Sequence, residues 1–225
     1  MSELPIATIK VTGPDAFEFL QGQLTNDLEI LSSEAEILAA WCNPKGRVVW
    51  FGTVAPISSG YALSAPEDLA EEIVQRLAVF RFRSRVEFAI EAADTTVDPV
   101  FLIENGYPFI GREQSEQFTP HMLNLDLLGA VSLDKGCYTG QEIVARTHYR
   151  GATKRRCLRF ESTEPVSAGA KVYDGDRVVG EVVNATGTDL LAVVPVDKAD
   201  ADLAIDGCAL RHVQLPYQFA SQQHV

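Results

Sequence analysis

Residues 135–146 read Lys-Gly-Cys-Tyr-Thr-Gly-Gln-Glu-Ile-Val-Ala-Arg, and they are the most informative stretch of this 225-residue chain. Thr139 is followed three residues later by Glu142, the spacing of a capping box, which predicts the start of a helix. Cys137 would then lie just before a helix N-terminus, two residues from Lys135. Because a helix N-terminus and a nearby cation both favour the thiolate over the thiol, this pattern indicates a reactive cysteine.

The backbone around Cys137 is also suited to a ligand. Gly136 and Gly140 allow close approach of a bound molecule, and the free N–H groups of a first helical turn can hold a carboxylate. The helix is expected to end near Tyr149, with Gly151 as its terminator. The alternative is structural: Cys137 would be a small core residue and the glycines would only form turns.

Basic residues are concentrated in the same region. The chain has a net charge of −12, yet residues 135–159 contain seven basic residues and one acidic residue. Arg146 and Arg150 would lie one turn apart on the expected helix, and the basic run 154–156 follows. Such a segment on an acidic protein predicts a site for a small anion with carboxylates, and the alternative is a solvated basic face.

Composition excludes several classes of protein. Hydrophobic residues make up 46% of the chain and charged residues 22%, which is typical of a globular protein. No apolar run approaches the ~20 residues that cross a bilayer, and residues 1–10 do not resemble a secretory signal, so we expect a cytoplasmic protein. The net negative charge argues against direct nucleic-acid or membrane binding. Arg81, Arg83 and Arg85, which could serve a nucleic-acid module, alternate like the solvated face of a strand.

The cysteines and histidines predict no metal site. The four cysteines contain no C-x-x-C pair, and the four histidines have no ligand spacing. In a cytoplasmic setting the cysteines are expected to be thiols.

The rest of the chain predicts an α+β fold followed by a β-rich part. Expected elements are a strand near 6–11, a helix from Thr12 to Gln23, a hairpin over 37–55, a helix that begins near Ser64, and a strand over 86–90. From about residue 156, a hairpin over 171–183 and strands at 190–194 and 209–215 predict a small barrel or sandwich.

The motif at 135–146, together with 149–151 and 154–156, resembles the signature of the YgfZ family. These are folate-binding proteins related to the T protein, the aminomethyltransferase of the glycine cleavage system. Further segments agree in order. Residues 19–27 resemble L-Q-G-Q-x-T-x-D, 42–47 the turn before the second strand, 103–106 I-E-A-G, and 118–125 F-x-P-x-x-x-N-L.

The resemblance implies the fold and its divisions. The expected fold is an aminomethyltransferase-like folate-binding α+β fold with a ferredoxin-like insert and a C-terminal β-barrel. The N-terminal folate-binding domain would comprise residues 1–45 and 95–155, the insert residues 46–94, and the barrel residues 156–225.

The resemblance also implies a function, that of a folate-binding accessory protein for assembly or repair of iron–sulfur clusters. Such a protein would support tRNA-modifying iron–sulfur enzymes. Its cofactor would be tetrahydrofolate, with or without a polyglutamate tail, and its partners iron–sulfur enzymes or cluster assembly factors. The alternative is a tetrahydrofolate-dependent aminomethyltransferase or demethylase. That chemistry needs a carboxylate where this chain has Gly46-Arg47-Val48, and Asp27 is the remaining candidate.

Site residues follow from the same resemblance. Glu104 takes the place of the glutamate that binds the pterin ring, where one carboxylate can accept from two adjacent N–H groups. Cys137 is the candidate catalytic residue. The folate-binding residues expected beside it are Lys135, Gly136, Tyr138, Gly140, Gln141, Glu142 and Arg146.

Overall fold

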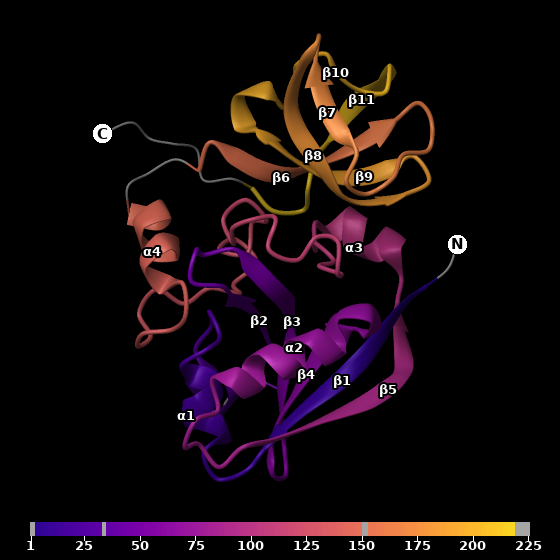
Figure 1. Cartoon of the computed structure of the whole chain (residues 1–225). Helices are drawn as coiled ribbons and strands as arrows, with labels where there is room; N and C mark the ends of the chain where they lie inside the picture. Colours follow the sequence, from indigo (N-terminus) through magenta and orange to yellow (C-terminus); the bar gives the residue numbers. More distant parts are fainter. Residues whose placement is uncertain (1–2, 33–34, 150–152, 219–225) are drawn as a thin grey trace.

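The computed structural model describes residues 3–32, 35–149 and 153–218. The described residues form a five-stranded sheet and a closed barrel. Figure 1 shows the long connection between α3 and α4 lying between them. The sheet has the order β2-β3-β4-β1-β5, and all its neighbouring strands are antiparallel. Its strands are β1 (Leu4–Thr12), β2 (Ile37–Cys42), β3 (Val48–Ile57), β4 (Gly60–Pro66) and β5 (Glu87–Val97).

Both faces of the sheet are covered by other parts of the chain. Side chains on a strand alternate between its two faces, so neighbouring residues of β2 join different apolar clusters. In β2, Ile37, Ala39 and Trp41 pack with α1 (Ala16–Gln21) and α2 (Glu67–Val79) in one apolar cluster. Ala40 and Cys42 belong to a second cluster, which joins the sheet to the α3–α4 connection and the barrel. This second cluster is the middle layer of the molecule.

Two helices begin later in the chain than the sequence patterns predict. Thr12 is the last residue of β1, and α1 begins only at Ala16 without a side-chain cap. Ser64 lies in β4, a strand that the sequence patterns did not indicate, and α2 begins after Pro66. Strand pairing between β1 and β4 takes up the residues that were expected to be caps. The longest helix in the described part, α2, has 13 residues, and no described helix is long and apolar enough to cross a membrane.

The C-terminal part is a closed six-stranded barrel with the order β10-β11-β6-β9-β8-β7. Side chains such as Phe160, Leu190 and Val172 fill its interior. Cys157 and Leu191, on the outer side, pack into the middle layer. The strands are β6 (Arg155–Ser162), β7 (Lys171–Asp174), β8 (Arg177–Thr186), β9 (Asp189–Pro195), β10 (Leu203–Ile205) and β11 (Cys208–Val213). Two short 3-10 helices lie in the described residues, η1 (Leu28–Ser32) and η2 (Val196–Lys198).

Two of the expected domain boundaries fall inside the five-stranded sheet. The boundary at 45/46 lies in the turn of the β2–β3 hairpin, and the boundary at 94/95 lies within β5. Residues 46–94 therefore supply strands to the same ladder as β1 and β2. The stretch 81–85, expected to be part of a strand, instead forms the loop between α2 and β5, where Phe82 has a φ of 40°.

Candidate functional site

The loop that carries Cys137 is attached to the protein through Lys135. The side chain of Lys135 is 7% exposed, and its Nζ donates to the carbonyl oxygens of Gln21 (2.8 Å), Leu24 (2.7 Å) and Asn26 (2.9 Å). Burial lowers the pKa of this ammonium to about 8. Lys135 thus holds residues 21–26 against the Cys137 loop, and its three donors are occupied by the protein itself.

A second attachment comes from the turn between β2 and β3. Gly140 has a φ of +83°, and a Cβ built there would lie 2.6 Å from the carbonyl oxygen of Asn43. The close approach at Gly140 is therefore to this turn. Helix α4 (Gln141–Tyr149) begins one residue later. The predicted capping box is wrong, because Gly140 and not Thr139 immediately precedes the helix. The hydroxyl of Thr139 instead donates to Oε1 of Gln23 (3.1 Å).

The anchored loop leaves Cys137 exposed. Gly136 beside it faces open space, since a Cβ added at this position would have no neighbouring heavy atom within 4 Å. Nε2 of Gln141 approaches the carbonyl oxygens of Lys135 and Gly136 at 3.5 Å. Tyr138 is 6% exposed, and burial raises the pKa of its hydroxyl. The thiol therefore stands at the surface on a fixed backbone.

The basic segment is mostly engaged within the fold. Arg155 donates to the carbonyl oxygens of Val179 and Val193, and Arg156 forms two hydrogen bonds with Asp126. Arg159 pairs with Asp189 at 2.9 Å. Three of the expected anion-binding side chains thus stabilise the barrel and its contacts. Glu142, Arg146 and Lys154 are exposed, while Arg150 and Gly151 lie outside the described residues.

A separate cavity of about 410 Å³ opens between the sheet and α3 (Pro99–Asn105). Phe51 and Thr53 of β3 line one side, and Phe101 and Leu102 of α3 line the other. The volume lies in the range of small-molecule sites, which are typically apolar with a few polar groups. No motif predicted these wall residues, because they come from strands and a helix that meet only in the folded chain.

The barrel fixes one wall of this cavity. Phe109 lines it, and Asn184 of β8 accepts from the Phe109 N–H and donates to the Phe109 carbonyl, both at 2.8 Å. The Phe101 and Tyr107 rings stack 6.4 Å apart at the same wall. The cavity is thus formed by the sheet, α3 and a loop that the barrel holds in place.

Glu104 and Cys137 are not brought together. Glu104 lies on α3 and is exposed, with Arg159 3.7 Å from its carboxylate. The Cys137 loop leads into α4, and Figure 1 shows α3 and α4 on opposite sides of the molecule. The expected site residues therefore divide into the Cys137 loop and the region of α3.

Asp27, the candidate carboxylate for one-carbon transfer, is engaged in local structure. Its Oδ1 accepts from Nε2 of Gln21 (2.7 Å) and from the backbone N–H of Glu29 (3.0 Å). The hydrogen bond from Gln21 is the main reason that its pKa lies below the ordinary value. This arrangement fits a residue that begins η1.

Comparison with known proteins gives matches for the barrel and for the chain. Residues 154–217 match the family model described as CAF17, C-terminal beta-barrel domain. The tRNA-modifying protein YgfZ of Hamiltonella defensa is 28% identical, in an alignment that covers 65% of this chain and 65% of that relative. YgfZ of Escherichia coli strain UTI89 is 27% identical over 83% of this chain and 78% of its own. An uncharacterized protein of Haemophilus influenzae is 28% identical over 93% and 94%.

Among solved structures, the glycine cleavage system aminomethyltransferase T from Bartonella henselae superposes with a TM-score of 0.70. It is 13% identical, and the match covers 92% of this chain and 82% of that protein. This likeness establishes the fold. The chain is thus similar in sequence to proteins named tRNA-modifying protein YgfZ, and it has the aminomethyltransferase-like fold with a C-terminal barrel that matches the CAF17 model.

Proposed function

We infer that this protein is a cytoplasmic folate-binding accessory protein that supports iron–sulfur cluster assembly or repair and, through it, tRNA-modifying iron–sulfur enzymes. Its similarity to proteins named tRNA-modifying protein YgfZ supports the biological role. The observation that carries the proposal is the apolar cavity of about 410 Å³ between the sheet and α3, in a fold shared with an aminomethyltransferase.

The residues of this cavity fit a pterin ring. Aromatic side chains provide flat surfaces for stacking, with Phe51 on the sheet and Phe109 on the loop. The hydroxyls of Thr53 and Ser64, 2.9 Å apart, supply polar groups in an otherwise apolar wall. Tetrahydrofolate, once bound, would supply one-carbon or redox chemistry, while these side chains bind and orient it.

Glu104 remains the proposed partner of the pterin N–H groups. It lies three residues after Phe101, and side chains at that spacing share one face of a helix. Its contact with Arg159 is long, at 3.7 Å, and the carboxylate is exposed, so binding would require it to leave Arg159 and turn toward the cavity.

The Cys137 loop would serve a different step from folate binding. An exposed thiol on an anchored backbone can form a transient bond to the iron of a partner protein's cluster. Gly136 beside the thiol faces open space, and Arg146 and Lys154, which follow in the sequence, are exposed cations. The site thus suits contact with another protein.

The role of Cys137 is tested in a strain that lacks its own homologue and carries this protein. We expect wild type to restore methylthio modification of tRNA, measured by mass spectrometry of digested tRNA, and Cys137→Ser to fail at equal protein abundance. Cys208→Ser is the matched control, because Cys208 lies on β11 of the barrel. Full restoration by Cys137→Ser would remove the role given to this thiol.

Folate binding is tested by calorimetry with tetrahydrofolate. Leu102→Trp should fill the cavity and weaken binding at least tenfold, whereas Leu102→Met should retain it because it nearly conserves volume. The one-carbon alternative predicts formaldehyde or methylenetetrahydrofolate release from methylated amines. Turnover that disappears in Asp27→Asn would favour that alternative.

A further inference from the structure

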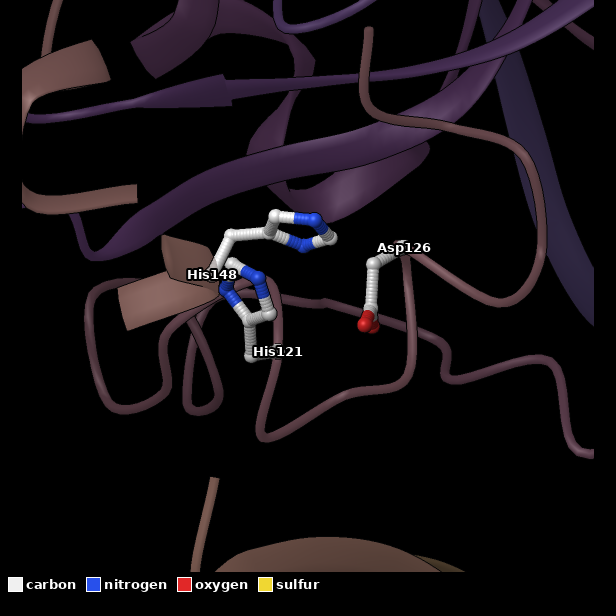
Figure 2. Close-up of side chains that lie close together, drawn as sticks. All are labelled: His121, Asp126 and His148. Atoms are coloured by element: carbon white, nitrogen blue, oxygen red, sulfur yellow. The ribbon is translucent and has the colours of Figure 1, made fainter. Parts of the chain in front are cut away.

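Two histidines and an aspartate that are distant in the sequence meet beside the C-terminal end of α4. Figure 2 shows His121 and Asp126 from the α3–α4 connection close to His148 from the last turn of α4. One ligand atom of each residue lies within 4.8 Å of those of the other two. Two imidazoles and one carboxylate form a donor set that proteins use for zinc and non-haem iron.

The environment of His121 points to a missing partner. Its side chain is 1% exposed, and neither ring nitrogen has a hydrogen-bond partner in the described part of the chain. Leaving a buried polar group unpaired is unfavourable, so such groups are rare and call for an explanation. The His148 ring lies 5.9 Å from the His121 ring between centroids, which leaves room for an ion that binds both.

Asp126 is held in place by Arg156. The guanidinium donates to both carboxylate oxygens, at 2.6 and 2.9 Å, and Nη1 also donates to the backbone oxygen of His121 at 2.9 Å. Each carboxylate oxygen has a further lone pair, and carboxylates that bind metals are commonly hydrogen-bonded in this way. The positive charge of Arg156 disfavours ions held by charge alone, such as Mg²⁺, relative to ions that imidazole binds.

Small movements would bring the three ligand atoms to the separations of a zinc site. In a tetrahedral zinc site the ligand atoms are separated by about 3.3 Å, as bond lengths near 2.0–2.1 Å require. The longest separation here is 4.8 Å at most. His148 is exposed on the last turn of α4, so its side chain has room to rotate toward the other two ligands.

We propose that His121, Asp126 and His148 form a binding site for a divalent first-row transition-metal ion, with a water molecule completing the coordination. Bound metal would join α4, which follows the Cys137 loop, to the connection that packs against the barrel. The site is independent of the folate cavity.

The test is a zinc titration of the full-length protein after chelator treatment, followed by calorimetry and by thermal unfolding. We expect one saturable site in wild type and a rise in Tm with Zn²⁺. His148→Ala should weaken binding at least tenfold, and His121→Leu should abolish it. His212→Ala, on β11 of the barrel, is the matched control and should bind as wild type does. Mg²⁺ should give no saturable heat.

Three results would overturn the proposal. These are the absence of saturable zinc binding in wild type, an unchanged affinity in His148→Ala, and loss of binding in Cys137→Ser with retention in His148→Ala. The last result would assign the zinc to the exposed thiol. His148→Ala should keep the unfolding transition of metal-free wild type, because the side chain is exposed, so reduced binding would not reflect misfolding.

Discussion

Replacing Lys135 by methionine should loosen the Cys137 loop without changing its surface. The methionine retains an unbranched side chain of similar length, but it cannot donate a hydrogen bond. Three backbone carbonyls, those of Gln21, Leu24 and Asn26, would lose a donor that lies 2.7 to 2.9 Å away.

The expected cost follows from those three contacts. An unsatisfied buried acceptor costs about 1–3 kcal/mol, so three acceptors cost about 3 kcal/mol at the lower end. Removing a buried ammonium returns part of its desolvation penalty. We therefore expect the free energy of unfolding to fall by about 2 kcal/mol, which in a chain of this size lowers Tm by about 4–8 °C.

Thermal and urea unfolding at pH 7 measure this change. Lys154→Met is the matched control, since Lys154 is exposed, and its stability should stay within about 0.5 kcal/mol of wild type. A Lys135→Met variant as stable as wild type would show that this ammonium does not anchor the loop. The anchored loop also predicts faster hydrogen exchange of residues 135–140 in Lys135→Met than in Lys154→Met.

Further predictions concern the same loop and its surroundings. The difference in free energy of unfolding between wild type and Lys135→Met should grow from pH 8 to 10, because the pKa of Lys135 is about 8 in the folded protein and 10.5 in the unfolded chain. Urea unfolding at each pH measures this difference, and a difference that does not change with pH would contradict the prediction. Gly140→Ala should destabilise by at least about 2 kcal/mol and Gly136→Ala by less than about 1 kcal/mol in urea unfolding, because only the first position is crowded and has a positive φ. Iodoacetamide should label Cys137 in the native state and spare Cys157, which burial protects and whose pKa burial raises to about 12; peptide mass spectrometry distinguishes them, and equal labelling would contradict the structure.

The sequence predicted the β2–β3 hairpin and the buried face of α2, which depend on residues close to one another in the chain. The hairpin over 37–55 forms around Asn43, whose side chain accepts from the N–H groups of Lys45 and Arg47. The buried face of α2, with Leu69 among its residues, follows from helical spacing. In both cases the interacting residues lie within a few positions of each other, so periodicity and turn chemistry were sufficient.

Contacts between distant segments could not be predicted in this way. Lys135 was expected to be a cation for Cys137 or a ligand, yet its partners lie 109 to 114 positions earlier. His121 and His148 have no recognisable ligand spacing, and the fold alone brings them together. The apolar cavity likewise joins β3 to α3, so the resemblance to a folate-binding family indicated a ligand class but not the walls that would hold it.

A crystal structure of the protein with tetrahydrofolate would show whether the cavity binds folate. We expect the pterin ring to lie in the cavity between the sheet and α3, in contact with Phe51 or Phe109, with Glu104 turned toward its N–H groups. An empty cavity at saturating tetrahydrofolate, or a folate bound only elsewhere on the surface, would contradict this expectation.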